Sequence, residues 1–438
     1  MATGAGPEAE LSRRLGSADG AAVVVTNVIG TGIFLTPAFI AQRVDTAGAF
    51  LALWVLGGLL SAIGALCYAE LAAMRPRAGG EYVYIREAFG PLAGFLSGWT
   101  SLVAGFSGAI AAAAVGFAIY LDRLVPGAGS TEPLFRLAPE SMGLDIAVTP
   151  RALVALALVG GFSWLHARGL GPGRLAQHVL AWLNVGTILV LVLLGFLADP
   201  GGAAPAGATA EPGAGGVLVA LVLVMFTYSG WNAAAYVAGE ARDPGRTLPR
   251  ALLGGTAIVA ALYLTLNVLY VRVLGTSGIG AAEATGDRVV EVLWGTLGTR
   301  LFTPLILLVL ASSVSAMVLT GPRVYFAMAR DRCLPRAFGR VGARRVPAFS
   351  IALQAGWSGI LVLSGGFEAL LTYTGFAVVL FAGVGVVSLF VLRRTAPDAE
   401  RPFRVPGYPV VPALFVLASA AMVIQSVLRA PTPSLAGV

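Results

Sequence analysis

The sequence predicts an all-α polytopic membrane protein, and three observations lead to this prediction. Hydrophobic residues make up 57% of the 438 positions and charged residues only 12%, whereas soluble domains are about a quarter charged. The mean hydropathy is +0.84. Apolar runs of about 20 residues recur along the chain, and each is long enough to cross a hydrocarbon layer of ~30 Å. Because backbone groups in hydrocarbon must bond internally, these runs must be helices.

We expect eleven transmembrane spans, preceded by an N-terminal tail at 1–19 that has no signal-peptide pattern. The spans cover residues 20–42, 48–74, 91–121, 150–167, 177–198, 215–240, 251–275, 300–330, 348–364, 368–392 and 409–428. The third span carries no charged residue and is too long for an upright helix, so it should be tilted.

The placement of arginine predicts the orientation. All 29 basic residues are arginine, and twenty of them fall in segments that are inside if the N-terminus is cytoplasmic, against seven outside. Positive loops stay in the cytoplasm, so we expect a multi-pass protein of the cell membrane with its N-terminus inside. This bias also explains the net charge of +7 without a nucleic-acid partner. Cys67 and Cys333 fall toward the cytoplasmic side and predict no structural disulfide.

The spans divide into two blocks of nearly equal length, 20–198 and 215–392, followed by a linker, the eleventh helix and a tail at 393–438. Each block holds five spans, so the second begins on the opposite side of the membrane. Two five-span blocks of opposite orientation are the pattern expected of a 5+5 inverted repeat.

The first span of each block contains a cluster of small residues near its middle, Gly30-Thr31-Gly32 in one and Thr227–Asn232 in the other. Such clusters weaken a helix, and an unwound segment survives in a membrane only if it faces protein, water or substrate. The N-terminus of the resumed helix suits a carboxylate, and the carbonyls that end the other half suit an ammonium. A zwitterionic amino acid has both groups. Close helix packing is the alternative explanation for the glycines.

Six motifs occur in a fixed order on this span pattern: GTGIF at 30–34, CYAEL at 67–71, PRAGGEYVYIREAFGP at 76–91, FTYSGWNAAAYVAGEARDPGRTLPRA at 226–251, GPRVYFAMARD at 321–331 and RPFRVPGYP at 401–409. With them the sequence resembles the amino acid–polyamine–organocation superfamily, whose fold is of the LeuT type. Within it the likeness is to the L-type amino acid transporters and their bacterial relatives. It covers about residues 15–430 and implies discontinuous helices 1 and 6. A twelfth helix is usual in the family, and we expect it to be missing or truncated in this sequence.

The resemblance implies a secondary active transporter that moves amino acids by alternating access. The backbone of Thr31, Gly32 and Ile33 would bind the substrate carboxylate, and backbone carbonyls at the two breaks would bind the α-amino group. Phe226 would also act as an outer lid. The complete set of implied substrate-binding residues is Asn27, Ile29, Gly30, Thr31, Gly32, Ile33, Phe226, Tyr228, Ser229, Gly230, Trp231 and Asn232.

The position that would couple transport to an ion departs from the family. Many sodium-independent members carry a lysine in span 5, where this chain has the neutral Asn184. Sodium-independent exchange or uptake is therefore favoured. Proton-coupled symport and a polyamine or other organic cation permease of the same fold remain alternatives. Ser312, Ser313 and Ser315 could hold an ion, or could bond back to their own helix.

Charged residues near the inner surface predict a gate. Arg323 in span 8 is expected to pair with Glu240 or Glu70 when the inner gate is shut, because ionisable groups in a span are usually paired. Snorkelling to the headgroups is the alternative. The amphipathic segment 81–87 is expected to lie along the inner face, either beside the gate or as a plain anchor.

Other function classes lack their signatures. His166 and His178 lack the nearby carboxylates, thiolates or nucleophile motif of a metal or catalytic site, and we expect both at the membrane interface. We therefore expect no enzyme, no metal and no cofactor. Two matched breaks favour one occluded site over the continuous pore of a channel. The outer loop at about 122–149 has no cysteine, and we therefore expect no disulfide-linked heavy subunit.

Overall fold

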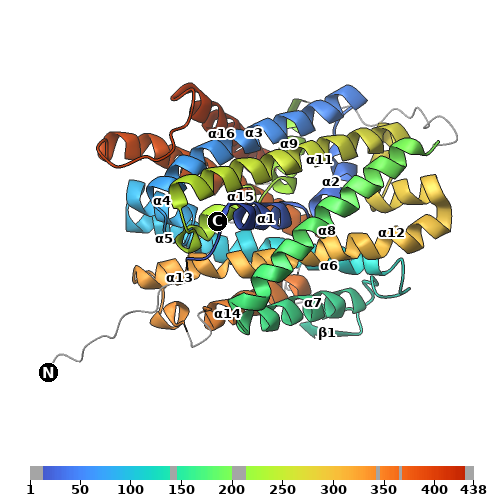
Figure 1. Cartoon of the computed structure of the whole chain (residues 1–438). Coiled ribbons are helices and arrows are strands. Elements are labelled where there is room, and N and C mark those ends of the chain that lie inside the picture. Colours follow the sequence, from blue (N-terminus) through green and yellow to red (C-terminus); the bar gives the residue numbers. More distant parts are fainter. Residues whose placement is uncertain (1–12, 139–145, 200–213, 342–345, 365–366, 430–438) are drawn as a thin grey trace.

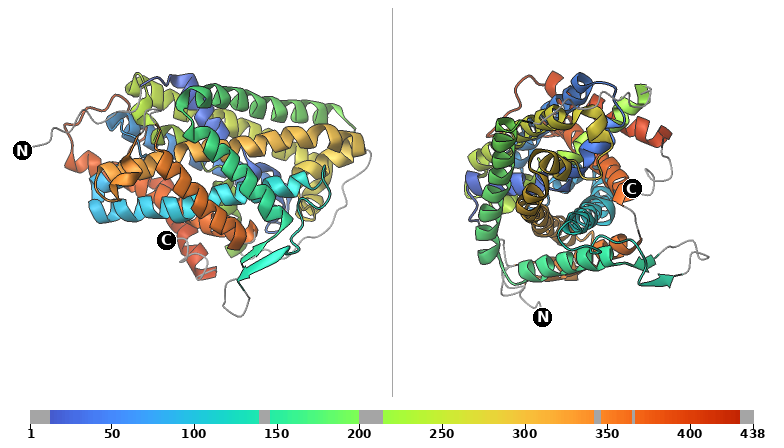
Figure 2. Two further views of the ribbon diagram at one scale, coloured as in Figure 1. Left: turned by 90° about the horizontal axis from the view of Figure 1, so that it is seen from below. Right: turned by 90° about the vertical axis from the view of Figure 1, so that its right-hand side faces the viewer.

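The computed structural model describes residues 13–138, 146–199, 214–341, 346–364 and 367–429, and helices make up most of it (Figure 1). The outer parts of the expected tails, 1–12 and 430–438, lie outside the described residues. Two short strands, β1 (Phe135–Ala138) and β2 (Ile146–Val148), pair antiparallel and project from the helical bundle (Figure 2).

The helices follow the expected spans. The first block forms α1 (Ser17–Val28), α2 (Thr31–Ala41), α3 (Ala47–Met74), α4 (Glu81–Phe89), α5 (Pro91–Thr100), the π-helix η1 (Ser101–Phe106), α6 (Ser107–Leu121), α7 (Pro150–Ala167) and α8 (Leu170–Leu197). The second forms α9 (Ala214–Thr227), α10 (Ala233–Tyr236), the 3₁₀ helix η3 (Ala238–Glu240), α11 (Pro244–Gly280), α12 (Thr285–Thr320), α13 (Pro322–Arg330), the 3₁₀ helix η4 (Arg336–Gly339), α14 (Ala348–Ser364) and α15 (Phe367–Thr395), and α16 (Val410–Arg429) follows it.

The described residues contain eight helices that are long and apolar enough to cross a membrane, or nine if the bent pair α1 and α2 is one span. Two shorter apolar helices, Gly216–Thr227 and Ala348–Ser364, lie at the sixth and ninth expected spans. Large apolar side chains on the outside of the bundle suit lipid rather than water: Trp182 and Leu197 of α8 are 74% and 75% exposed. The prediction of a polytopic, all-α membrane protein is confirmed.

Helix boundaries and kinks have local causes. Thr46 and Thr149 cap α3 and α7 by accepting hydrogen bonds from Ala49 N and Ala152 N, both at 3.1 Å. Gly275 in α11 and Gly295 in α12 have φ values of 65° and 59°, which bend both helices. The predicted end of the seventh span at 275 therefore coincides with a kink, and the eighth helix begins earlier than the predicted 300.

The packing places both broken spans inside the bundle. α11 packs against α3 and α1, and α12 packs against α6 and α8. α2 lies against α9, and α1 lies against α10, so the two spans that are interrupted contact each other along both halves. In the right-hand view of Figure 2, α6 and α12 are seen nearly end-on, with α7 and α8 at the edge of the bundle. This arrangement brings the two unwound segments to the same place.

Candidate functional site

The first span is interrupted where the sequence predicted. α1 ends at Val28, and α2 begins at Thr31 after a bend of 43°. Ile29 is extended, and Gly30 has φ −153° and ψ −148°. The first N–H groups of α2 have no carbonyl one turn earlier in the same helix, so they are available as donors for an anion.

The sixth span is interrupted at the matching place. α9 ends at Thr227, a run of turns follows, and α10 begins at Ala233. Gly230 has a φ of +103°, a conformation that favours glycine. The Phe226 carbonyl already accepts a hydrogen bond from Ser229 N at 2.9 Å.

The two breaks touch each other through glycine. A Cβ on Gly230 would lie 2.9 Å from the backbone carbonyl carbon of Asn27, and one on Gly32 would lie 3.0 Å from Thr227 Cα. Both explanations for the glycines therefore apply: the helices are unwound at these positions, and the unwound segments pack closely against each other.

Tyr263 of α11, which sequence reasoning missed, joins the two broken ends. Its hydroxyl lies 2.7 Å from the Val28 carbonyl oxygen and 3.3 Å from the Thr227 carbonyl oxygen. Those are the final carbonyls of α1 and α9, which otherwise lack helical partners. No local pattern around Tyr263 distinguishes it from the other buried tyrosines of the spans.

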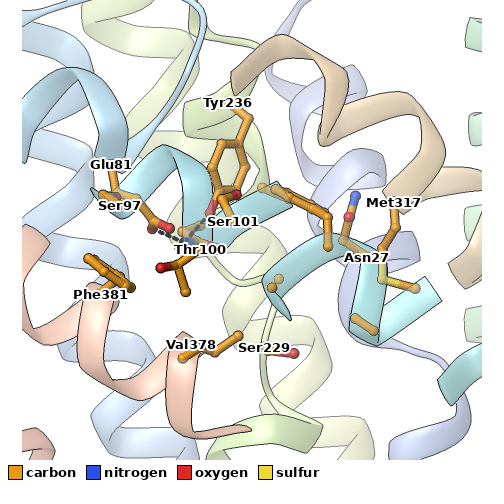
Figure 3. A pocket seen from close by; sticks show the side chains of 17 residues that line it. Asn27, Glu81, Ser97, Thr100, Ser101, Ser229, Tyr236, Met317, Val378 and Phe381 are labelled. Atoms are coloured by element: carbon orange, nitrogen blue, oxygen red, sulfur yellow. Dashed lines mark hydrogen bonds between the residues drawn. The ribbon is translucent and has the colours of Figure 1, made fainter. Parts of the chain in front are cut away.

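A pocket of about 70 Å³, measured as the space open to the centre of a water-sized sphere, lies beside these breaks. Each water needs about 10–15 Å³ on this measure, so a small solute fits. In Figure 3 Asn27 and Met317 lie toward one end and Glu81 and Tyr236 toward the other. The lining residues are Asn27, Glu81, Ser97, Thr100, Ser101, Gly105, Phe106, Ala109, Ser229, Gly230, Asn232, Ala233, Tyr236, Met317, Ala377, Val378 and Phe381.

Eight of the seventeen lining residues have polar side chains, and the rest are glycine or apolar. Small-molecule sites likewise combine apolar walls with polar groups that orient the ligand. Three of its residues, Ser101, Gly105 and Phe106, belong to the π-helix η1. π-Helical turns are frequent at functional sites. Sequence reasoning missed η1: Thr100 and Ser101 are polar residues inside the third span, but composition does not distinguish a π-helical turn from an α-helical one.

Four predicted substrate residues line this pocket: Asn27, Ser229, Gly230 and Asn232. The others do not: Ile29, Gly30, Thr31, Gly32, Ile33, Phe226, Tyr228 and Trp231. The Trp231 ring packs edge-on against Tyr68 and Phe415. The Tyr228 ring packs against Trp54 and Tyr263.

The residues at the expected coupling position make separate contacts. Asn184 Nδ2 donates to Ser312 Oγ at 2.7 Å, and the single hydroxyl hydrogen of Ser312 can go either to the Val309 carbonyl at 2.7 Å or to Asn184 Oδ1 at 2.9 Å. Ser313 lies beside Gly30 at the first break. Ser315 Oγ lies 2.8 Å from His166 Nε2.

The histidines differ from each other. His166, expected at the membrane interface, is only 2% exposed and lies in the bundle, because Ser315 of α12 supplies the partner that its ring needs. His178 remains partly exposed and contacts Asp19 of α1.

The charged residues that were expected to form a gate belong to two separate clusters. Arg323 Nε lies 3.2 Å from Glu240 Oε1, and the two side chains are 1% and 6% exposed. Glu70 is not the partner of Arg323: it accepts hydrogen bonds from Arg393 at 2.6 and 2.9 Å and from Val405 N at 2.7 Å. Glu70 therefore joins α3 to α15 and to the segment before α16.

Comparison with known proteins extends over almost the whole chain. A family model described as amino acid permease matches residues 15–436. The human b(0,+)-type amino acid transporter 1 is 28% identical over 434 residues, which cover 96% of this chain and 84% of that protein. The large neutral amino acids transporter small subunit 2 of Mus musculus is 29% identical over 425 residues, with 94% and 77% covered. The Asc-type amino acid transporter 1 of Mus musculus is 27% identical over 429 residues, with 96% and 78% covered.

Proposed function

The chain belongs to the amino acid permease family, and from that premise we propose that it moves amino acids across a membrane by alternating access, with the substrate held at the two broken spans. The relatives named above are transporters rather than enzymes. One observation carries the proposal: two helices lose their regular backbone hydrogen bonding at points that pack against each other, Gly230 against Asn27 and Gly32 against Thr227.

The two ends of the substrate would be held by different backbone groups. The N–H groups of Thr31, Gly32 and Ile33 open α2, where the helix dipole favours a carboxylate. The carbonyls near Ser229 and Asn27 would accept from the α-ammonium. The substrate side chain would then extend into the pocket between Phe106, Met317 and Phe381. Thr31, Gly32 and Ile33 do not line the pocket in this conformation, so binding requires the substrate to reach the N-terminus of α2.

We assign gate roles to Phe226 and to the Arg323–Glu240 pair from where they lie relative to the broken sixth span. Phe226, at the end of α9, is buried at 6% exposure and would close over the substrate from the outer side. The Arg323–Glu240 pair joins α13 to η3, the inner continuation of the sixth span, and would hold the inner side shut. Glu70 would support this region indirectly, through Arg393 and Arg401.

Exchange or uptake without sodium is the favoured coupling mode. Asn184 is neutral, and its amide is occupied by Ser312, so this position offers no titratable group. We also propose the cell membrane as the location, a cytoplasmic N-terminus, an assembly of two five-helix blocks at 20–198 and 215–392, and function without a disulfide-linked subunit. The sequence has two cysteines; Cys67 is buried in α3, and Cys333 lies between α13 and η4.

Counterflow in proteoliposomes tests the function. We expect saturable uptake of a labelled amino acid that is stimulated by unlabelled amino acid inside and is unchanged when potassium replaces sodium. Val378→Trp, which adds volume inside the pocket, should lower this flux by about tenfold or more. Val190→Trp on the exposed face of α8 makes the same change toward lipid and should have little effect.

Two results would count against the proposal. If none of the twenty amino acids competes for uptake, the substrate class is wrong, and polyamines become the next candidates. If Val190→Trp and Val378→Trp lower the flux equally, the pocket is not the substrate site.

A further inference from the structure

A carboxyl group closes one end of the substrate pocket. Glu81, the first residue of α4, lines the pocket, and its Oε2 accepts hydrogen bonds from Tyr68 Oη at 3.1 Å and Asn232 Nδ2 at 3.0 Å. The Tyr236 hydroxyl also hydrogen-bonds to this carboxyl. Figure 3 shows the Tyr236 side chain directed toward the Glu81 carboxyl at the same end of the pocket. All three partners are uncharged, so the carboxyl is held without a counter-charge.

Within the described part of the chain, no cation pairs with Glu81. The nearby arginines are paired with other acids: Arg86 with Asp331, Arg323 with Glu240, Arg393 with Glu70 and Arg75 with Glu87. Five other titratable groups around α4 are uncharged tyrosines: Tyr68, Tyr82, Tyr84, Tyr236 and Tyr325. The remaining arginines on the helices that pack against α4 are Arg330, whose guanidinium lies over Phe326, and Arg394 of α15, which is exposed.

The surroundings favour proton uptake by this carboxyl. Burial raises the pKa of Glu81 above its usual range, although the hydrogen bonds from Tyr68, Tyr236 and Asn232 oppose the shift. The hydroxyl of Ser97, which also lines the pocket and is 1% exposed, has no hydrogen-bond partner. A water bound there would supply the hydrogen-bond partner that the Ser97 hydroxyl lacks, and it would provide a route for a proton into the pocket.

We propose that Glu81 binds a proton from the pocket and that this proton travels with the amino acid, which makes the transporter a proton symporter. The inference rests on the proposed function and adds to it the coupling ion and the residue that holds it. The carboxylate gains one proton from the side of entry and becomes a neutral acid, and it loses that proton on the other side.

Glu81 is connected to the part of the protein that must move. Asn232 and Tyr236 belong to the inner half of the broken sixth span, and the Tyr236 carbonyl accepts from Gly79 N at 3.1 Å, just before α4. Hydrogen bonds to a charged carboxylate are about twice as strong as those to a neutral group. Protonation would therefore loosen α4 from this half of the span.

Uptake driven by a pH gradient tests the proposal. The protein is placed in proteoliposomes with the outside one pH unit more acidic, the membrane potential clamped at zero, entrapped pyranine to report proton entry, and an equimolar labelled mixture of the twenty amino acids. One proton per substrate can drive accumulation up to about tenfold per pH unit. We expect wild-type protein to accumulate label above equilibrium and to lose this accumulation when a protonophore is added.

Variants assign the effect to Glu81. Glu81→Gln should carry a reduced counterflow that no longer responds to the gradient, whereas Glu81→Asp, which keeps a titratable group, should still accumulate label. Glu87→Gln changes an acid on the same helix that is paired with Arg75 at the surface and should behave as wild type. If Glu81→Gln does not fold, Tyr236→Phe replaces it: loss of this donor should move the pH of half-maximal uptake upward.

Three outcomes would overturn the inference. Wild-type counterflow that ignores the gradient leaves amino acid transport intact but removes the proton site, whereas the absence of any counterflow is a failure of the proposed function itself. Gradient-driven accumulation that persists in Glu81→Gln excludes Glu81. A Glu81→Gln variant that loses only lysine and arginine flux shows that the carboxylate binds the substrate's side-chain cation instead.

Discussion

Gly230 has two reasons to be glycine. Its φ of +103° is unfavourable for any residue with a Cβ, and an added Cβ would also meet backbone atoms of Asn27 at 2.9–3.0 Å. A backbone neighbour cannot rotate away as a flexible side chain can. The position therefore fixes both the shape of the second break and its distance from the first.

Gly230→Ala should consequently disrupt the site. The left-handed conformation alone costs about 1–2 kcal/mol, and the contact with Asn27 adds to this, so we expect a lower melting temperature and a severe loss of counterflow. Gly254→Ala on α11 is the matched control, because nothing lies within 4 Å of its added Cβ. Equal counterflow in the two variants would show that the breaks tolerate separation.

Glu81 and His166 show what a residue's local pattern does not reveal. Segment 81–87 reads as an amphipathic surface helix, yet Tyr82, Val83, Tyr84 and Ile85 are buried and Glu81 lines the pocket. A polar face looks the same in sequence whether it meets headgroups or an internal cavity. The buried partner of His166 is Ser315, which is 149 positions away in the sequence, and no local pattern predicts that contact.

At the scale of elements, the sequence predicted the interruptions that composition causes. The Gly30-Thr31-Gly32 cluster and the Thr227–Asn232 cluster lack strong helix formers, and both lie at breaks. The π-helix at Ser101–Phe106 was not predicted, because a shift in hydrogen-bond register has no compositional signature. The choice of Glu240 over Glu70 as partner for Arg323 also depended on the packing of α13 and η3.

The Arg323–Glu240 pair should be coupled energetically across those two elements. Loss of one partner from a buried pair costs about 3–5 kcal/mol, because it strands the other charge. We expect Arg323→Ala to lower the melting temperature strongly and the double variant Arg323→Ala/Glu240→Ala to recover part of the loss. The exposed pair Arg288–Glu291, at 53% and 52% exposure, should contribute at most about 1 kcal/mol. A double variant no more stable than Arg323→Ala would mean that the charges act independently.

Over the whole molecule, further long-range contacts support the face that carries the Arg323–Glu240 pair. The Glu240 carbonyl accepts from Arg14 N and Leu15 N, both at 2.9 Å, and Arg242 N donates to the Leu15 carbonyl at 3.0 Å. The start of the chain is thus joined to the end of the sixth span. Glu70 ties α15 to α3 on the same side. Because these contacts join elements that are far apart in the sequence, we propose that they hold this face shut in one state of the alternating-access cycle.

Thiol labelling tests that expectation. Ser101 lines the pocket, so a single cysteine at this position, in a background with Cys67→Ser and Cys333→Ser, reports which face reaches the site. We expect Arg323→Ala to raise its reaction with an impermeant methanethiosulfonate from the N-terminal face by about tenfold or more, since each 1.4 kcal/mol lost from a closed state is a factor of ten. Reaction from the opposite face should not rise, because a single population is divided between the two openings. Arg288→Ala in the same background controls for general loosening, and equal increases from both faces would show that the pair stabilises the bundle without gating it.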